Sequence, residues 1–188
     1  MEGRLFIIAG CSGVGKGTIL KKFLEKNPEI KLSVSATTRK PRAGEQDGVN
    51  YFFITKDEFK KEIENNDFLE WAEFSGNFYG TKKSFVENTL RTGTDVILEI
   101  EVQGAKQVKE KMPDAISIFI MPPSFEELES RLRGRHTEDE ETIQRRLHEA
   151  FREIEAGKTF DYRVVNDDLE DALNQLDEIY KSVRKEKC

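Results

Sequence analysis

The sequence predicts an α/β fold in which a parallel sheet carries helices on both faces. Short apolar segments of strand length alternate with longer amphipathic segments of helical period. Strands joined in this way by helices build a parallel sheet. A glycine-rich stretch follows the first apolar segment directly and leads into the first helix. The length of 188 residues suits one such domain with a core of its own.

The apolar segments and the periodic segments define the elements in chain order. We expect buried strands at residues 5–9, 96–100, 116–121 and 163–165, with a fifth strand near 31–35. We expect helices around residues 18–26, 104–111, 124–133, 138–156 and 169–184. The strands together predict a five-stranded parallel core sheet.

Two stretches interrupt the alternation of strands and helices. Residues 37–83 are rich in Gly, Tyr, Phe and charge, and the alternation in "YFFIT" and "EWAEF" predicts a small, mostly antiparallel insertion. Residues 134–141 form an exposed, strongly charged connection inside a helical region. Insertions at such positions often carry substrate recognition and closure.

Composition excludes several classes of function. With 30 basic and 36 acidic side chains, the formal charge is −6, which disfavours a broad nucleic-acid surface. No segment has the length of a membrane span or the pattern of a signal peptide. The two cysteines, Cys11 and Cys188, lack metal-ligand spacing and fit free thiols in a reducing compartment. We therefore expect a cytoplasmic protein with small-molecule partners, and the sequence leaves open whether it is a monomer or a homo-oligomer.

The stretch "GCSGVGKGT" between the first strand and the first helix predicts a phosphate-binding loop. Its backbone N–H groups can converge on phosphate oxygens at the positive end of the helix, and Lys16 adds a mobile charge for the β- and γ-phosphates. The alternative is a turn that needs glycine for steric reasons alone. The same position at a helix N-terminus favours the thiolate of Cys11. The predicted nucleotide contacts are Gly10, Cys11, Ser12, Gly13, Val14, Gly15, Lys16, Gly17 and Thr18.

Gly17 stands where a magnesium-binding hydroxyl is usually expected. The metal would then depend on nucleotide oxygens, water and an acidic residue on a neighbouring strand. The run "DVILEIE" offers Glu99 and Glu101, which we expect on one side of the strand. Two carboxylates at the end of a buried strand are costly unless they are paired or bind a ligand. The alternative is a strand end that reaches solvent.

Several further segments, in the same order, resemble those of guanylate kinases. They are "SVSATTRKPRAGEQDGVNYFF", "FLEWAEFSGNFYGT", "LEIEVQGAK", "RLRGRHTEDEETIQRRL" and "VVNDDL", and with the glycine loop they extend from about Leu5 to Leu169. The resemblance implies a P-loop three-layer α/β/α fold with a five-stranded parallel core sheet. It adds a small mixed β/α GMP-binding insertion and a helical lid. It also implies one domain, with residues 1–34, 84–123 and 154–188 as core, 35–83 as the GMP-binding part and 124–153 as the lid.

The resemblance implies transfer of the γ-phosphoryl group of ATP to GMP, giving ADP and GDP, with Mg²⁺ accompanying ATP. The attacking phosphate oxygen is already ionised, so the reaction needs charge neutralisation and positioning and no general base. Two alternatives remain open at this point. One is a guanylate-kinase-like scaffold module that binds phosphopeptides, and the other is a kinase for a different nucleoside monophosphate. The intact glycine loop favours catalysis.

The resemblance assigns GMP contacts to the inserted part of the chain. Arg39, Arg42, Tyr51 and Tyr79 would hold the GMP phosphate, although the arginines could form a solvated loop and Tyr51 a minor core. Guanine presents two adjacent hydrogen-bond donors, and one carboxylate can accept from both. The acid of "FLEW" would therefore face the guanine, and the alternative is a surface acid on a short strand. The predicted GMP contacts are Ser35, Arg39, Arg42, Tyr51, Glu70, Tyr79, Thr81 and Glu101, and Glu99 would hold the metal through water.

The lid is expected to supply charge to ATP. Thr137 and Glu140 have the spacing of a capping box that starts its helix. The apolar face of that helix comprises Ile143, Leu147, Ala150, Phe151 and Ile154, with Arg146 beside it and Arg145 pointing to solvent. By resemblance, Lys16, Arg39, Arg131, Arg135 and Arg146 are the catalytic candidates, and Asn166 lies beside the adenine.

Two of these assignments have a plain alternative, and three departures from the family pattern involve four positions. Arg131 could pair with nearby glutamates on the surface, and Asn166 could belong to a simple turn. Cys11 stands where the family often has proline, and His136 where it often has glycine. Glu99 and Glu101 replace aspartates, which changes their reach by one methylene. None of these departures removes a charge that phosphoryl transfer requires.

Overall fold

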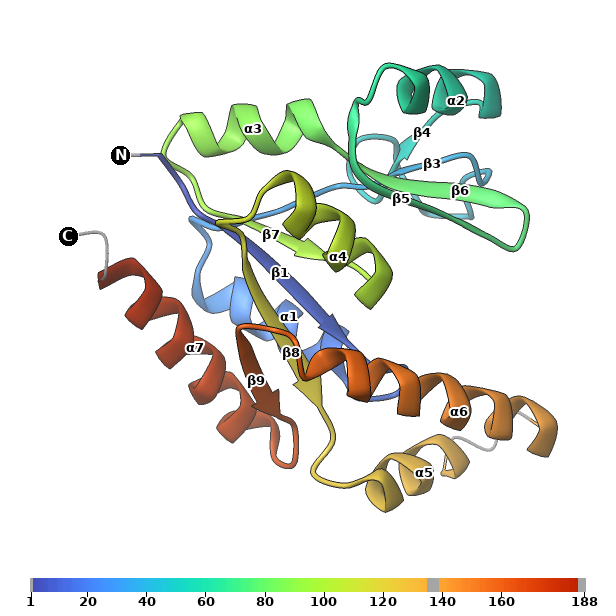
Figure 1. Cartoon of the computed structure of the whole chain (residues 1–188), viewed down its shortest axis with the longest axis vertical. Helices are drawn as coiled ribbons and strands as arrows, with labels where there is room; N and C mark the ends of the chain where they lie inside the picture. The colour runs from blue at the N-terminus through green and yellow to red at the C-terminus, as the bar shows by residue number, and fades with distance from the viewer. Residues whose placement is uncertain (1, 135–138, 186–188) are drawn as a thin grey trace. The chain divides into compact units, whose positions relative to one another are not determined.

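The structure, a computed structural model, describes residues 2–134 and 139–185 (Figure 1). It has two compact units, Met1–Ile7 with Glu29–Ile116 and Ile8–Pro28 with Ser117–Cys188. The core sheet confirms the predicted α/β fold and the five parallel strands. In spatial order its strands are β2 (Lys31–Leu32), β7 (Val96–Glu99), β1 (Leu5–Gly10), β8 (Ile116–Met121) and β9 (Tyr162–Val165).

The first unit contains the predicted insertion as a second sheet. Its strands, in spatial order, are β4 (Phe52–Phe53), β3 (Ala36–Thr37), β6 (Asn77–Lys82) and β5 (Phe68–Phe74). Only β3 and β4 pair in parallel, so the sheet is mostly antiparallel as expected. Phe59 stacks on Phe68 with 4.3 Å between ring centroids, and this aromatic cluster is the core of the insertion.

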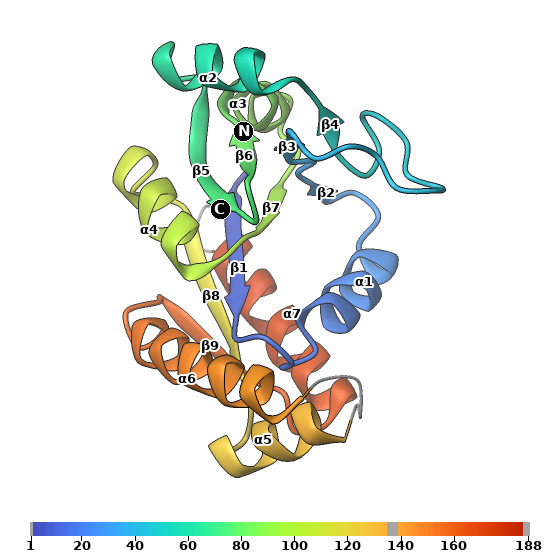
Figure 2. The same cartoon turned by 90° about the vertical axis from the view of Figure 1, so that its right-hand side faces the viewer.

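Three helices complete the first unit: α2 (Lys56–Glu64), α3 (Lys83–Arg91) and α4 (Val102–Lys111). The sequence reasoning did not predict α2 or α3. Thr55 and Glu58 form a capping box that starts α2. Helix α4 runs along β5 (Figure 2).

Two predicted strand ends in this unit are wrong. The strand expected near residues 31–35 stops at Leu32, because the chain crosses from the core sheet to β3 within four residues. Strand β7 ends at Glu99, so Glu101 is the residue before α4 and not part of a strand. Both glutamates are exposed, so neither carboxylate bears the desolvation cost that the sequence pattern suggested.

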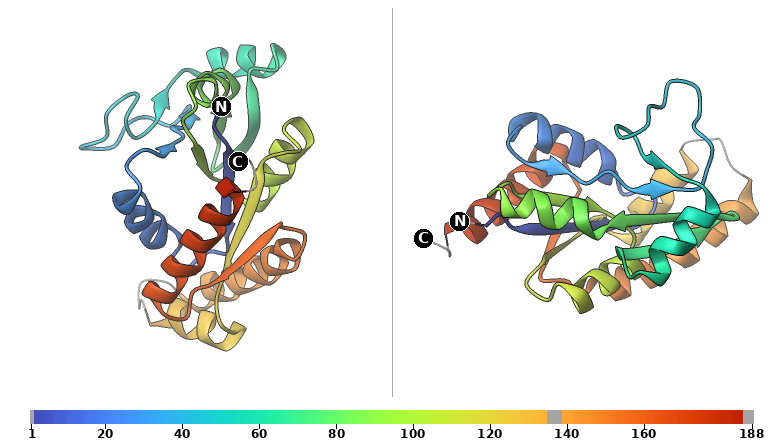
Figure 3. Two further views of the ribbon diagram at one scale, coloured as in Figure 1. Left: turned by 90° about the vertical axis from the view of Figure 1, so that its left-hand side faces the viewer. Right: turned by 90° about the horizontal axis from the view of Figure 1, so that it is seen from above.

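The second unit contains α1 (Lys16–Lys26), α5 (Phe125–Arg133), α6 (Glu140–Gly157) and α7 (Leu169–Lys185). Helix α7 packs against α1 and β9, with Phe23 and Tyr180 edge to face at 5.8 Å between centroids (Figure 3). Within the described residues, no helix combines the length and the apolar character that a membrane span requires.

The start and the apolar face of α6 differ from the sequence prediction. Asp139 caps the helix by accepting a hydrogen bond from the N–H of Thr142, in place of the cap predicted at Thr137, which lies outside the described residues. Phe151 is 56% exposed and packs edge to face on Phe125, so it lies outside the buried face. The buried residues of that face are Ile143, Leu147 and Ala150, and Ile154 is half-buried.

Candidate active site

The predicted site residues fall into two groups, one in each compact unit. The glycine loop and the predicted ATP contacts belong to the second unit, and the predicted GMP contacts belong to the first. Arg135 lies outside the described residues. Each group is built from its own unit.

Backbone conformation and space both require glycine in the loop that joins β1 to α1. Gly13 and Gly15 have φ values of +86° and +89°, which residues with a side chain rarely adopt. A Cβ atom on Gly13 would lie 2.8 Å from a methyl carbon of Leu132, and one on Gly15 would lie 2.8 Å from the side-chain nitrogen of Asn166. Gly15 is also the N-cap of α1 and has no side chain with which to cap it. The positive end of α1 can therefore receive an anion.

Two of the residues predicted on the ATP side contact this loop, and a third contacts one of those two. The side-chain nitrogen of Asn166 donates to the carbonyl of Val14 at 2.7 Å. Arg146 donates to the hydroxyl of Ser12 at 2.6 Å, whereas Arg145 is exposed as expected. Arg131 donates to the carbonyl of Asn166 at 2.9 Å. Arg131 also forms the glutamate pair that was its alternative, with 2.8 Å between its Nε and Oε1 of Glu127.

The expected thiolate of Cys11 is contradicted by its surroundings. The side chain is 2% exposed, and burial together with the carboxylate of Glu153 raises the thiol pKa to about 12. The charge of Lys16 opposes this shift without overcoming it. At neutral pH the residue is therefore a buried thiol.

We expect alkylation of Cys11 by iodoacetamide at pH 8 to be far slower in the native protein than after unfolding. The rise from 9.0 to about 12 lowers the thiolate fraction by about three orders of magnitude. The raised pKa also affects stability, because the thiol of the unfolded chain ionises near 9.0 and that of the native protein only at about 12. The free energy of unfolding therefore declines as pH rises from 9.0 toward about 12. Mass spectrometry of labelled protein measures the rate, and equal labelling of native and unfolded chains would contradict the buried thiol.

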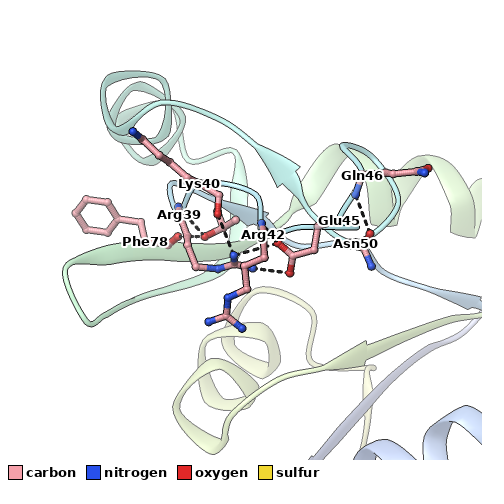
Figure 4. A network of polar contacts seen from close by, with 8 residues as sticks. Arg39, Lys40, Arg42, Glu45, Gln46, Asn50 and Phe78 are labelled. Atoms are coloured by element: carbon pink, nitrogen blue, oxygen red, sulfur yellow. Dashed lines mark hydrogen bonds and ion pairs between the residues drawn. The ribbon is translucent and has the colours of Figure 1, made fainter.

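In the first unit, an ion pair fixes the first arginine of "TTRKPR" (Figure 4). Two terminal nitrogens of Arg39 donate to the two carboxylate oxygens of Glu45 at 3.0 and 2.8 Å. Glu45 also accepts the backbone N–H of Arg42 at 2.7 Å. The hydrogen bonds from Arg39 and from this N–H lower the pKa of Glu45, and the hydrogen bond to Glu45 raises the pKa of Arg39. Figure 4 shows the guanidinium of Arg42 pointing away from this carboxylate. The sequence reasoning missed Glu45, whose signal is its place six residues beyond Arg39 in the same loop.

Two tyrosines complete this cluster. The guanidinium of Arg39 lies over the ring of Tyr51, 5.4 Å from its centroid. Tyr51 packs edge to face on Tyr79, with 6.2 Å between ring centroids. Tyr79 also contributes to the raised pKa of Arg39. The structure therefore brings together three of the four residues predicted to hold a phosphate.

Glu70 is a buried carboxylate, which excludes the surface-acid alternative. It is 6% exposed, and burial raises its pKa against the opposing effect of hydrogen bonds from Thr81. The hydroxyl of Thr81 donates to Oε1 at 2.6 Å. Oε2 lies against Gly104 of α4, where a Cβ atom would come within 2.8 Å of it. Ser35, which was predicted to share this pocket, is half-buried.

A β-bulge decides where Glu70 points. The register of β5 with β6 shifts between Phe68 and Glu70, so regular alternation fails there. Phe68 and Trp71 therefore both belong to the aromatic cluster, while Glu70 turns to α4. Glu99 at the end of β7 and Glu101 before α4, by contrast, are exposed carboxylates. In the described part of the chain no group of three or more acidic, His or Cys side chains is arranged to hold a metal.

Comparison with known proteins shows the family to which the sequence and the fold are similar. Residues 2–183 match the family model described as Guanylate kinase. The chain is 53% identical over 176 residues to the guanylate kinase of Synechococcus sp. (strain JA-3-3Ab), covering 94% of this chain and 81% of that protein. It is 51% identical over 181 residues to the guanylate kinase of Clostridioides difficile (strain 630), covering 96% and 88%. The crystal structure of guanylate kinase from Anaplasma phagocytophilum superposes with a TM-score of 0.74 at 34% identity, covering 96% and 86%.

Proposed function

The chain belongs to the guanylate kinase family, and from that premise we propose which of its residues carry out the reaction. The activity is transfer of the γ-phosphoryl group of ATP to GMP. The observation that carries the proposal is the buried Glu70, bound by Thr81 and packed under Gly104. A carboxylate is kept in such a place at a cost in stability, and a ligand with two donors compensates that cost.

Glu70 reads the guanine base in this proposal. The N1–H and the amino group of guanine are adjacent donors, which one carboxylate can accept together. At that edge adenine has a lone pair on N1 and no amino group at C2. The ionised carboxylate would therefore repel adenine and remain without hydrogen-bond donors. Ser35, Thr81 and Glu101 are assigned to the remaining edge of the base.

Arg39, Arg42, Tyr51 and Tyr79 hold the GMP phosphate in this proposal. The two hydrogen bonds between Arg39 and Glu45 set the orientation of one guanidinium, which also lies over the ring of Tyr51. Arg42 contributes a second cation whose charged end is directed away from Glu45. Together they offset the charge of the incoming phosphate before it meets the phosphates of ATP.

We expect R39A and R42A each to raise KM for GMP more than tenfold while KM for ATP changes less than twofold. Each loses a charge-assisted contact to phosphate, which is worth roughly 1.5–3 kcal/mol. The measurement is steady-state kinetics with one nucleotide varied and the other saturating. A loss of affinity shared equally by ATP and GMP would contradict the assignment.

On the ATP side, the loop N–H groups of residues 10–18 and Lys16 hold the phosphates, with Arg131, Arg135 and Arg146 supplying further positive charge. Asn166 contacts the adenine. The acceptor is an ionised phosphate oxygen, so positioning and charge stabilisation carry the rate without a general base.

Mg²⁺ enters as part of the substrate MgATP in this proposal and neutralises charge on the transferred phosphoryl group. Gly17 offers it no side-chain oxygen, and the exposed carboxylate of Glu99 is a hard oxygen ligand that would reach it through water.

We propose that the chain acts as a single domain in the cytoplasm, with ATP and GMP as its small-molecule partners. Residues 35–83 form the GMP-binding part, 124–153 the lid, and 1–34, 84–123 and 154–188 the core. The bulged β5 supports the assignment of the GMP-binding part, and the contact of Arg146 with Ser12 supports that of the lid.

A further inference from the structure

Two edge strands of this protein are held by the same side-chain device. Strand β5 is one edge of the four-stranded sheet, and β9 is one edge of the five-stranded sheet. Gln107 of α4 accepts from the N–H of Trp71 at 3.1 Å and donates to its carbonyl at 3.0 Å. Gln175 of α7 accepts from the N–H of Val165 at 3.1 Å and donates to its carbonyl at 3.2 Å. Each side-chain amide thus pairs with the backbone as a neighbouring strand would.

On the GMP side, this contact lies one residue from the carboxylate that reads guanine. Trp71 follows Glu70 directly, at a bulge where regular pairing with β6 is interrupted. The residue opposite Trp71 is Gly80, which has no side chain to pack against it. Gln107 fixes this backbone from its outer edge, on the helix that also provides Gly104. Because Gly104 and Gln107 are three residues apart, they lie on one face of α4.

On the ATP side, the equivalent contact is the last one before the strand ends. Val165 is the final residue of β9, and Asn166 follows it. The backbone N–H of Asn166 donates to the carbonyl of Met121 at 2.8 Å, and its side chain donates to Val14 of the glycine loop. Gln175 fixes the strand end from which Asn166 extends.

We infer that Gln107 and Gln175 are positioning residues, one for each nucleotide. Gln107 fixes Glu70 for guanine, and Gln175 fixes Asn166 beside the glycine loop for ATP. The first part rests on the proposed role of Glu70 and the second on that of Asn166. Both glutamines act through strand backbone, because each of their described contacts here is to a main-chain atom.

The variants Q107M and Q175M test this inference and serve as controls for each other. Methionine keeps most of the side-chain volume and removes both hydrogen bonds. We expect Q107M to raise KM for GMP about tenfold and to leave KM for ATP within about twofold. We expect Q175M to show the reverse, with kcat within about threefold in both variants. Thermal unfolding of each variant is measured in parallel.

A double variant separates positioning from general destabilisation. If Gln107 acts through Glu70, Q107M adds no further rise in KM for GMP when E70Q is already present. KM values unchanged in both single variants, or raised equally for both nucleotides, would overturn the inference whatever the change in Tm. If instead E70Q leaves the preference for GMP intact, the proposed role of Glu70 is what fails.

A second pair of variants covers a failure of Q107M or Q175M to fold. Q107E and Q175E keep the oxygen that accepts the backbone N–H but place a second oxygen against the backbone carbonyl. Each must raise KM for its own nucleotide more than for the other. A uniform effect on both nucleotides would again overturn the inference.

Discussion

Replacing Lys16 by alanine is expected to lower kcat by about 10²- to 10³-fold while the protein stays folded. Lys16 is the first residue of α1, directly after the glycine loop, and it is the lysine proposed to contact the phosphates of ATP. We expect the charge of Lys16 to stabilise the transferred phosphoryl group more in the transition state than in the bound substrate. Its loss should therefore lower kcat more than it weakens binding. A coupled assay of ADP formation measures it.

The matched control is K21A, which removes an exposed lysine from the same helix. We expect its kcat to equal that of the unmodified chain. Unfolding temperatures of both variants show whether any loss is a folding defect. Retention of most of the activity by K16A would remove this lysine from the mechanism.

The second large effect is expected for E70Q, which should lower kcat/KM for GMP by about 10²-fold or more and spare that for AMP. The amide replaces one acceptor oxygen by a donor, which opposes a donor of guanine.

A second consequence of E70Q concerns the stability of the fold. Burial raises the pKa of Glu70, so its ionisation costs folding free energy as pH rises above the ordinary value of 4.5. E70Q should therefore be at least as stable as the unmodified chain at pH 7 without ligand.

The control for E70Q is E73Q, an exposed glutamate on the same strand. We expect neither its nucleotide preference nor its stability to change. An E70Q protein that keeps its preference for GMP over AMP would contradict the guanine assignment, even if its total activity falls.

The sequence was informative wherever the pattern was local and strong. The strand at Ile116–Met121 is apolar apart from Ser117, and its predicted bounds are the observed ones. The glycine loop was recognisable because backbone geometry demands glycine at Gly13 and Gly15. By contrast, α3 escaped prediction although Val86 and Leu90 are spaced for a buried helix face. That signal lies at the margin of an aromatic-rich segment whose alternation suggested strands.

The site was less predictable than the fold, because its details depend on long-range packing. Alternation cannot place Glu70 and Phe68 on different sides of β5, since the bulge depends on pairing with β6. The thiol pKa of Cys11 depends on burial, which outweighs the helix N-terminus that the sequence displays. Glu45 offers no signal beyond its nearness to Arg39 in the loop, and its role is seen only in the two hydrogen bonds that join them.

An acceptor panel measures directly whether the chain phosphorylates GMP in preference to other nucleoside monophosphates. ADP formation from MgATP is followed with GMP, AMP, UMP and CMP as separate acceptors, using the unmodified chain. We expect turnover with GMP and a kcat/KM at least about 10²-fold lower for the other three nucleotides. Comparable turnover of AMP, or no turnover with any acceptor, would contradict it.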